Sequence, residues 1–206
     1  MPSVYDLKPK FQSLLRPIVG AMARAGVTAN QVTVAAMLLS VAAGAAIYFS
    51  RSMSILLLLP GVLFVRMALN AIDGMLAREH NQKTPLGAIL NELGDVISDA
   101  ALYLPLAFFL PFDAKAMVLI VFFGTLTEMT GIVAVQIGAS RRYDGPMGKS
   151  DRAFVFGTLG LLLGLNVPIF PVVRCVLWIV LFLLVLTILN RARGALRELQ
   201  GDKVHE

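Results

Sequence analysis

Two neighbouring apolar segments of the sequence carry an unusual set of polar residues: Asn70-Ala-Ile-Asp73-Gly74-Met-Leu-Ala77-Arg78 and, eight residues later, Gly87-Ala-Ile-Leu-Asn91-Glu-Leu-Gly-Asp95-Val-Ile-Ser-Asp99. Asn70 and Asp73 are three residues apart, and Asn91, Asp95 and Asp99 follow at intervals of four. Residues three or four apart share one face of a helix. Because the connection is short, we expect two antiparallel neighbouring helices whose polar faces meet near one end.

The surrounding sequence is that of a membrane protein. Of its 206 residues, 57% are hydrophobic and only 15% are charged, whereas soluble domains carry about 25% charged residues. A spanning helix needs roughly 20 mostly apolar residues. Six windows qualify: 31–50, 53–78, 86–110, 114–139, 152–167 and 170–190. We therefore expect an all-α polytopic membrane protein with six transmembrane helices, forming one domain over residues 1–206.

The N-terminal segment alternates apolar residues with cations between Tyr5 and Arg24. This pattern predicts an amphipathic helix on the membrane surface, and a helix packed on the bundle fits it equally well. The expected organisation is a juxtamembrane helix over 1–27, a six-helix bundle over 28–190 and a cytoplasmic tail over 191–206.

The distribution of Lys and Arg predicts the orientation. With the N-terminus inside, the inner segments hold fourteen Lys and Arg residues and the outer loops only Arg51 and Lys115. Cytoplasmic loops carry such an excess of cations, so both termini are expected in the cytoplasm, at a bacterial-type inner membrane. The net charge of +5 then favours anionic lipid over nucleic acid as partner.

Metal chemistry is restricted by composition. The single cysteine, Cys175, and two histidines, His80 and His205, exclude a disulfide framework and a His-based metal centre. Carboxylate and amide oxygens instead suit Mg²⁺ or Mn²⁺.

The polar pattern resembles the signature of the CDP-alcohol phosphotransferases, Asp-x2-Asp-Gly-x2-Ala-Arg-x8-Gly-x3-Asp-x3-Asp. The early segment Thr28-Ala-Asn30-Gln-Val-Thr33 also resembles the Pro-Asn-x-x-Thr that opens the first helix in many members. The resemblance covers nearly the whole chain. It implies a six-helix enzyme of phospholipid biosynthesis, commonly a homodimer, that moves a phosphatidyl group from CDP-diacylglycerol to an alcohol and releases CMP.

The resemblance also implies residue roles. It makes Asp95 the catalytic base that takes the proton of the attacking hydroxyl. The metal ligands would be Asn70, Asp73, Asn91 and Asp95. The CDP-lipid would bind at Asn30, Thr33, Gly74, Ala77, Arg78 and Gly87.

Two positions depart from the family pattern, because Asn70 and Asn91 stand where the family has aspartate. Fewer anionic ligands weaken the binding of divalent cations. The site is therefore expected to bind metals weakly, to use a single metal, or to bind nucleotide without catalysis. A working but altered enzyme is favoured, since the rest of the signature is intact.

A basic segment separates the fourth and fifth windows and holds Arg141, Arg142, Lys149 and Arg152. Its charges fit anionic lipid headgroups or a pocket for a phosphorylated acceptor, since Arg binds phosphate through two parallel hydrogen bonds. The acceptor is left open among inositol, inositol phosphate, glycerol phosphate, the amino acid serine, and less familiar polyols.

Arg66 lies one turn before Asn70, and Asp99 lies one turn beyond Asp95 on the antiparallel helix. The two are expected at similar depth, where pairing would neutralise costly intramembrane charges. Glu128 is the alternative partner of Arg66.

Two other functions compete with catalysis. An inactive relative that binds CDP-lipid or acts as a scaffold would explain Asn70 and Asn91. A transporter would explain intramembrane carboxylates, although no internal repeat is visible and the carboxylates cluster at one end.

Overall fold

The structure is a computed structural model that describes residues 4–50 and 52–202. Arg51 and Lys203, which entered the predicted orientation, and His205 lie outside the described residues. The elements follow in the order α1 (Val4–Arg24), α2 (Ala29–Ser50), the 3-10 helix η1 (Met53–Leu57), α3 (Leu58–Glu79), α4 (Pro85–Tyr103), the 3-10 helix η2 (Leu104–Phe108), α5 (Ala114–Gln136), α6 (Lys149–Gly164) and α7 (Phe170–Asp202).

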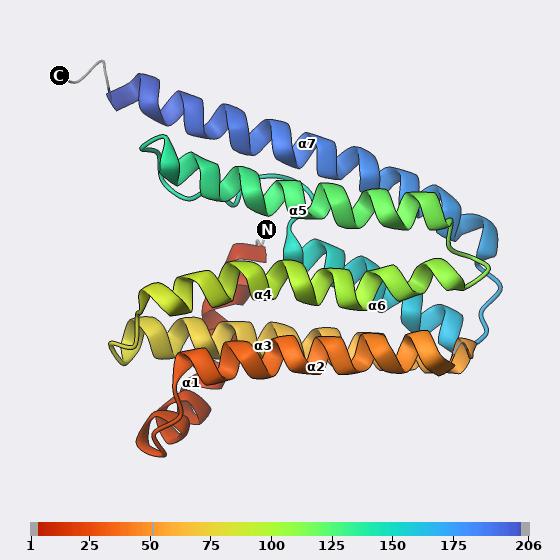
Figure 1. Ribbon diagram of the computed structural model, residues 1–206, viewed down its shortest axis with the longest axis horizontal. Coiled ribbons are helices and arrows are strands. Elements are labelled where there is room, and N and C mark those ends of the chain that lie inside the picture. The colour runs from red at the N-terminus through yellow and green to blue at the C-terminus, as the bar shows by residue number, and fades with distance from the viewer. Residues whose placement is uncertain (1–3, 51, 203–206) are drawn as a thin grey trace.

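Helices α2 to α5 and α7 run lengthwise in one bundle, with the α3–α4 loop and the end of α7 at the same end (Figure 1). The described residues contain helices and no strand. Within the part of the chain that the structure describes, four helical segments are long and apolar enough to cross a membrane: Ala29–Ser50, Met53–Glu79, Ala114–Gln136 and Phe170–Gln200. Large apolar side chains, such as Phe49, Phe64 and Trp178, are exposed on the outside of the bundle. Such a surface is suited to lipid.

The six predicted windows each contain a helix, but two of these helices do not meet the length and hydropathy criterion for a membrane span. Helix α4 carries Glu92, Asp95 and Asp99, and α6 has only 16 residues, which is about 24 Å of helix. That all six helices cross the membrane therefore stays a prediction.

Four predicted windows differ from the observed helices by three residues or more. The fifth window, 152–167, is observed three residues earlier, as Lys149–Gly164. In the third window the α-helix ends at Tyr103 and continues as the 3-10 helix Leu104–Phe108. Pro105 causes this change, because proline cannot donate the next α-helical hydrogen bond. The fourth window ends at Gln136, three residues early. The last window continues through the predicted tail to Asp202, since Ala195 and Leu199 pack against Ala134 and Ala139.

Helix α6 begins in the middle of the bundle (Figure 1). Residues 137–148 fold back from the end of α5, and Met147 N donates to Thr187 Oγ1 on α7 at 3.0 Å. Gly145 has φ of +123° and packs directly on Thr187, a conformation that suits glycine. The first residues of α6 are thereby carried to the depth of the polar residues of α3 and α4.

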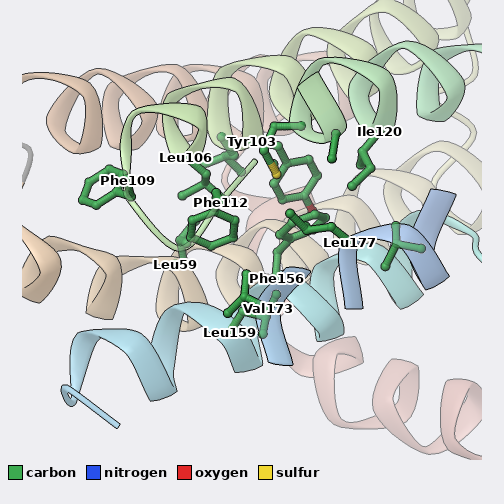
Figure 2. Packing of buried hydrophobic residues seen from close by; sticks show 14 of the residues in the cluster. Leu59, Tyr103, Leu106, Phe109, Phe112, Ile120, Phe156, Leu159, Val173 and Leu177 are labelled. Carbon is green, nitrogen blue, oxygen red and sulfur yellow. The ribbon is translucent and has the colours of Figure 1, made fainter. Parts of the chain in front are cut away.

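The largest apolar core cluster joins residues of α2 to α7, and Figure 2 shows part of it, with Leu59, Leu106 and Phe156 among the labelled side chains. Tyr103 and Phe156 stack there with ring centroids 4.5 Å apart. Helices α2 and α4 touch at Gly44, where an added β-carbon would lie 2.0 Å from the carbonyl oxygen of Ala101. Such small-residue contacts are typical of helix packing in membranes.

Helix α1 packs on α3. Leu15 and Val19 are buried with Ile72 and Leu76, whereas Leu14 remains 72% exposed. The helix therefore packs on the bundle, as the second of the two alternatives predicted. Its location on a membrane surface stays a prediction.

Candidate active site

A cavity of 390 Å³ lies between the start of α2, the end of α3 and the start of α4. We call it the α2–α4 cavity. The six residues expected to bind CDP-lipid all line it, together with two of the four expected metal ligands: Asn30, Thr33, Asp73, Gly74, Ala77, Arg78, Gly87 and Asn91. Segments about fifty residues apart in the sequence thus form one concave site.

The α3–α4 loop is tied to the start of α2 by side-chain hydrogen bonds. Gln82 Oε1 accepts from Ala29 N at 2.7 Å, and Asn30 Nδ2 donates to Thr84 Oγ1 at 3.3 Å. Thr84 also caps α4 by accepting from Gly87 N at 2.9 Å, and Pro85 follows at the first helical position, where proline is favoured. These hydrogen bonds hold the loop in place without a ligand, so the cavity is preformed.

Two glycines keep the walls of the cavity close. A β-carbon at Gly87 would lie 2.6 Å from Asn30 Oδ1, and one at Gly74 would lie 3.0 Å from Arg78 Nη2. The guanidinium of Arg78 therefore folds over Gly74 at the cavity wall. A side chain at Gly87 would force Asn30 to shift, and one at Gly74 would displace the Arg78 guanidinium slightly.

Asp73 lies at the inner wall of the cavity and is 5% exposed. Its Oδ2 accepts a hydrogen bond of 2.8 Å from Thr33 Oγ1. The same hydroxyl lies 3.1 Å from the carbonyl oxygen of Ala29, one turn earlier on α2, which is its alternative acceptor. The early Asn30–Thr33 motif and the α3 carboxylate are thus brought together, as the sequence resemblance implied.

Asp95 is contacted on both carboxylate oxygens. Lys149 Nζ lies 2.5 Å from Oδ2, and Asn70 Nδ2 donates to Oδ1 at 3.2 Å. Arg66 Nη2 lies 3.4 Å from the same Oδ1. Asn70 therefore presents its amide nitrogen, and not an additional negative charge, to Asp95.

The predicted pair of Arg66 with Asp99 is confirmed. Arg66 Nη1 lies 2.5 Å from Asp99 Oδ1, and Arg152 reaches Asp99 Oδ2 through Nε and Nη2 at 3.0 and 2.8 Å. Glu128 is not the partner of Arg66. Its carboxylate lies instead 3.4 to 3.5 Å from Arg141, Arg152 and Arg191.

Of the four cations expected to bind an acceptor, three contact carboxylates of α4 and α5 and the fourth, Arg142, contacts other carboxylates. Lys149 and Arg152 lie on α6 at Asp95 and Asp99, and Arg141 lies 2.9 Å from Glu92 on α4. Arg142 binds Asp144 at 2.7 Å and Glu198 at 2.8 Å. The hydrogen bond with Asp144 raises the pKa of Arg142. Each cation faces its own carboxylate, so the structure does not gather them into one phosphate pocket.

Arg191 is a buried cation that the sequence analysis placed only in the tail. It is 2% exposed, donates to the carbonyl of Thr127 and lies next to Glu128. Glu92 was likewise missed. The spacing from Glu92 to Asp95 and then to Asp99, three and four residues, is the sequence signal that could have placed Glu92 on the polar face of α4.

These charged residues form what we call the polar network. Among the described residues it contains five carboxylates and five cations: Asp73, Glu92, Asp95, Asp99 and Glu128 with Arg66, Arg141, Lys149, Arg152 and Arg191. Its formal charge is zero. Ion pairs buried in this way are costly to break, because removal of one partner leaves an uncompensated charge.

The four expected metal positions do not fit a pair of divalent cations. Only Asp73 and Asp95 are carboxylates there, and Lys149 already contacts Asp95. Within residues 4–50 and 52–202, no group of three or more His, Cys, Asp or Glu side chains is arranged to hold a metal. A two-metal centre would have to displace an ammonium group and then rely on two carboxylates and two amides.

A family model described as CDP-alcohol phosphatidyltransferase matches residues 26–191. The chain is also similar to the inner membrane protein YnbA of Escherichia coli (strain K12). The two are 49% identical over 195 residues, which cover 94% of this chain and 96% of YnbA.

The fold is similar to solved structures of the Mycobacterium tuberculosis phosphatidylinositol phosphate synthase PgsA1. The structure with CDP-DAG bound has a TM-score of 0.71 and 22% identity, and covers 87% of this chain and 92% of PgsA1. The structure with manganese and citrate has a TM-score of 0.72 and 24% identity, with 87% of each chain covered. At these identities the likeness shows the fold.

Proposed function

The chain belongs to the CDP-alcohol phosphatidyltransferase family, and we propose that it transfers a phosphatidyl group from CDP-diacylglycerol to a hydroxyl acceptor with release of CMP. The observation that carries the proposal is the α2–α4 cavity, which all six expected CDP-lipid residues line. A similar fold in PgsA1 has been solved with CDP-DAG bound. The cavity supplies the concave, preformed site that a nucleotide needs.

Arg78 and Lys83 line the cavity and give it positive charge for a pyrophosphate. Small residues admit the cytidine: Gly74, Ala77 and Gly87 leave the cavity floor without bulky side chains. The lipid chains would leave the cavity toward the apolar outer surface of the bundle. The site thus separates the polar nucleotide from the diacylglycerol of the same substrate.

The reaction requires positioning and neutralisation of charge more than covalent chemistry. The acceptor oxygen forms a bond to the phosphorus that carries diacylglycerol, and its proton passes to Asp95. The bond from this phosphorus to the bridging oxygen breaks, and CMP leaves with the electron pair. No step is routed through the two Mg²⁺ or Mn²⁺ ions that the resemblance implies, since the residues do not fit a pair of cations.

The acceptor hydroxyl must approach Asp95, so the acceptor lies beside the polar network. Of the four cations predicted to bind it, Arg141 and Arg142 precede α6 and the other two contact Asp95 and Asp99. Because every one of them faces a carboxylate, the site favours an acceptor that is neutral or zwitterionic over one with a free phosphate.

We propose that the protein works in a bacterial-type inner membrane, with both termini and the active site on the cytoplasmic side, and as a homodimer. YnbA, its relative, is named an inner membrane protein. The placement of Lys and Arg supports the orientation.

The test is CMP release from CDP-diacylglycerol in liposomes that contain the purified protein and a panel of polyol acceptors. Asp95→Asn should reduce the rate by about 10²- to 10⁴-fold, the usual effect of removing a general base. Its affinity for CDP-diacylglycerol, measured by titration, should change much less.

Binding without CMP release for any acceptor would contradict catalysis and favour the inactive CDP-lipid-binding relative, for which Asn70 and Asn91 argue. Absence of binding would contradict the proposed function altogether. Ion flux through the same liposomes would indicate a transporter.

A further inference from the structure

The Lys149 ammonium lies at one of the two carboxylates that remain of the family's four. Its Nζ lies 2.5 Å from Asp95 Oδ2, and Asn70 Nδ2 donates to the other oxygen of Asp95 at 3.2 Å. Asp73, the other remaining carboxylate, lines the α2–α4 cavity, whereas Asp95 lies outside the cavity lining.

The fold holds Lys149 in this place. It is the first residue of α6, which starts inside the bundle (Figure 1). Gly148 N donates to Asp151 Oδ2 at 2.8 Å, and Met147 is fixed to α7 through Thr187. The side chain of Lys149 is 30% exposed, so it is neither free on the surface nor sealed in the core.

The formal charges of the site are balanced when the Lys149 ammonium is included. Asn at positions 70 and 91 removes two negative charges from the family pattern, and the polar network is neutral without any metal. Two divalent cations would leave this buried network with an excess of four positive charges. A single ammonium at Asp95 leaves it balanced.

We propose that the Lys149 ammonium takes at Asp95 the position of a divalent cation, so that this chain binds CDP-lipid without divalent metal. The inference rests on the proposed function, because it concerns the same donor site. An ammonium carries three hydrogen-bond donors and no acceptor. One is used on Asp95, which leaves two for the pyrophosphate of the CDP-lipid.

The first test is titration of CDP-diacylglycerol into the full-length protein in EDTA and again in Mn²⁺. The unmodified protein should bind equally well in both. In EDTA, Lys149→Met should weaken binding by at least about tenfold, since it removes a charge-assisted contact. Lys149→Arg is the matched control that keeps the charge and should retain most of the affinity.

The second test uses Mn²⁺ alone and reads its electron paramagnetic resonance spectrum, so it does not depend on activity. The unmodified protein should leave the spectrum of free Mn²⁺ unchanged. The triple variant Asn70→Asp, Asn91→Asp, Lys149→Met restores four carboxylates without the ammonium and should bind Mn²⁺.

Binding of CDP-diacylglycerol that occurs only with Mn²⁺ would overturn the role of Lys149 and leave the proposed function standing. The same holds if the unmodified protein binds Mn²⁺ through Asp73. Failure to bind CDP-diacylglycerol in both buffers would instead overturn the proposed function. If Lys149→Met bound CDP-diacylglycerol in EDTA as tightly as the unmodified protein, the ammonium would have no part in the donor site.

Discussion

The α2–α4 cavity and the polar network differ in how they are built, although they meet at Asp73. The cavity is open and is held by neutral hydrogen bonds between the α3–α4 loop and α2. Its lining combines small residues and amides with four charged residues, Asp73, Arg78, Lys83 and Glu92. The network is dense and buried, and its cations and carboxylates are paired. The cavity is ready to receive a substrate. In the network, an incoming acceptor can contact a cation only by replacing a carboxylate that already contacts it.

The difference predicts where a substitution acts. In the cavity a changed side chain alters ligand binding and leaves the fold intact. In the network the same kind of change leaves a buried charge without its partner, and the fold itself is weakened. Stability and donor affinity are therefore expected to respond independently.

The largest effect is expected from the Arg66–Asp99 pair. Arg66→Leu should lower the free energy of unfolding by about 3–5 kcal/mol, because Asp99 keeps its charge in a buried site. The double variant Arg66→Leu, Asp99→Leu should be more stable than the sum of the single effects by about 1–3 kcal/mol. Unfolding in mixed detergent micelles would provide the four free energies of this cycle.

Arg152 complicates the cycle, since it also binds Asp99. A parallel cycle of Arg66→Leu with Glu128→Leu serves as the control, because these two residues are not an ion pair in the structure. Coupling of the same size in both cycles would show that the network responds as a whole and not through the Arg66–Asp99 contact.

An intermediate effect, confined to binding, is expected at Gly87. Gly87→Ala places a methyl group 2.6 Å from Asn30 Oδ1, so Asn30 or the start of α4 has to move. We expect the affinity for CDP-diacylglycerol to fall by about tenfold, or roughly 1.4 kcal/mol, with little change in the unfolding free energy.

Gly61→Ala is the matched control for Gly87→Ala. Both glycines lie in helices, but a β-carbon at Gly61 meets nothing within 4 Å. It should leave affinity unchanged and raise stability slightly, because alanine is the better helix former. Equal losses of affinity in both variants would show that the effect does not come from the cavity wall.

The sequence predicted the cavity better than the network. The cavity residues follow from local signals, the Asn30–Thr33 motif and the intervals of the signature, which carry the family resemblance. Helical periodicity also predicted that Arg66 and Asp99 would lie at the same depth. These relations are short in sequence or come from two helices joined by a short loop.

The network depends on where distant segments of the chain fold back into the bundle. The periodicity of the sequence does not predict these positions. Residues 137–148 return into the bundle, so Lys149 and Arg152 reach Asp95 and Asp99 instead of lying in an exposed basic loop. Arg191 was assigned to the tail because apolar composition weakens there, yet α7 continues and buries it. The shortness of the fifth window was the one visible trace of this arrangement.

The smallest effect is expected at Arg142, which of the four cations predicted to bind an acceptor is the one outside the polar network. It joins Asp144 in the loop to Glu198 on α7, and both partners are substantially exposed. Exposed ion pairs contribute little to stability, so Arg142→Ala should change the acceptor KM by about threefold or less and leave the donor KM unchanged. Steady-state kinetics with each substrate varied in turn would measure both constants. A rise of the acceptor KM well beyond this, with the donor KM constant, would mean that Arg142 leaves its carboxylates to bind the acceptor. The boundary between open cavity and closed network would then lie further toward α7, and a phosphorylated acceptor would become the better fit.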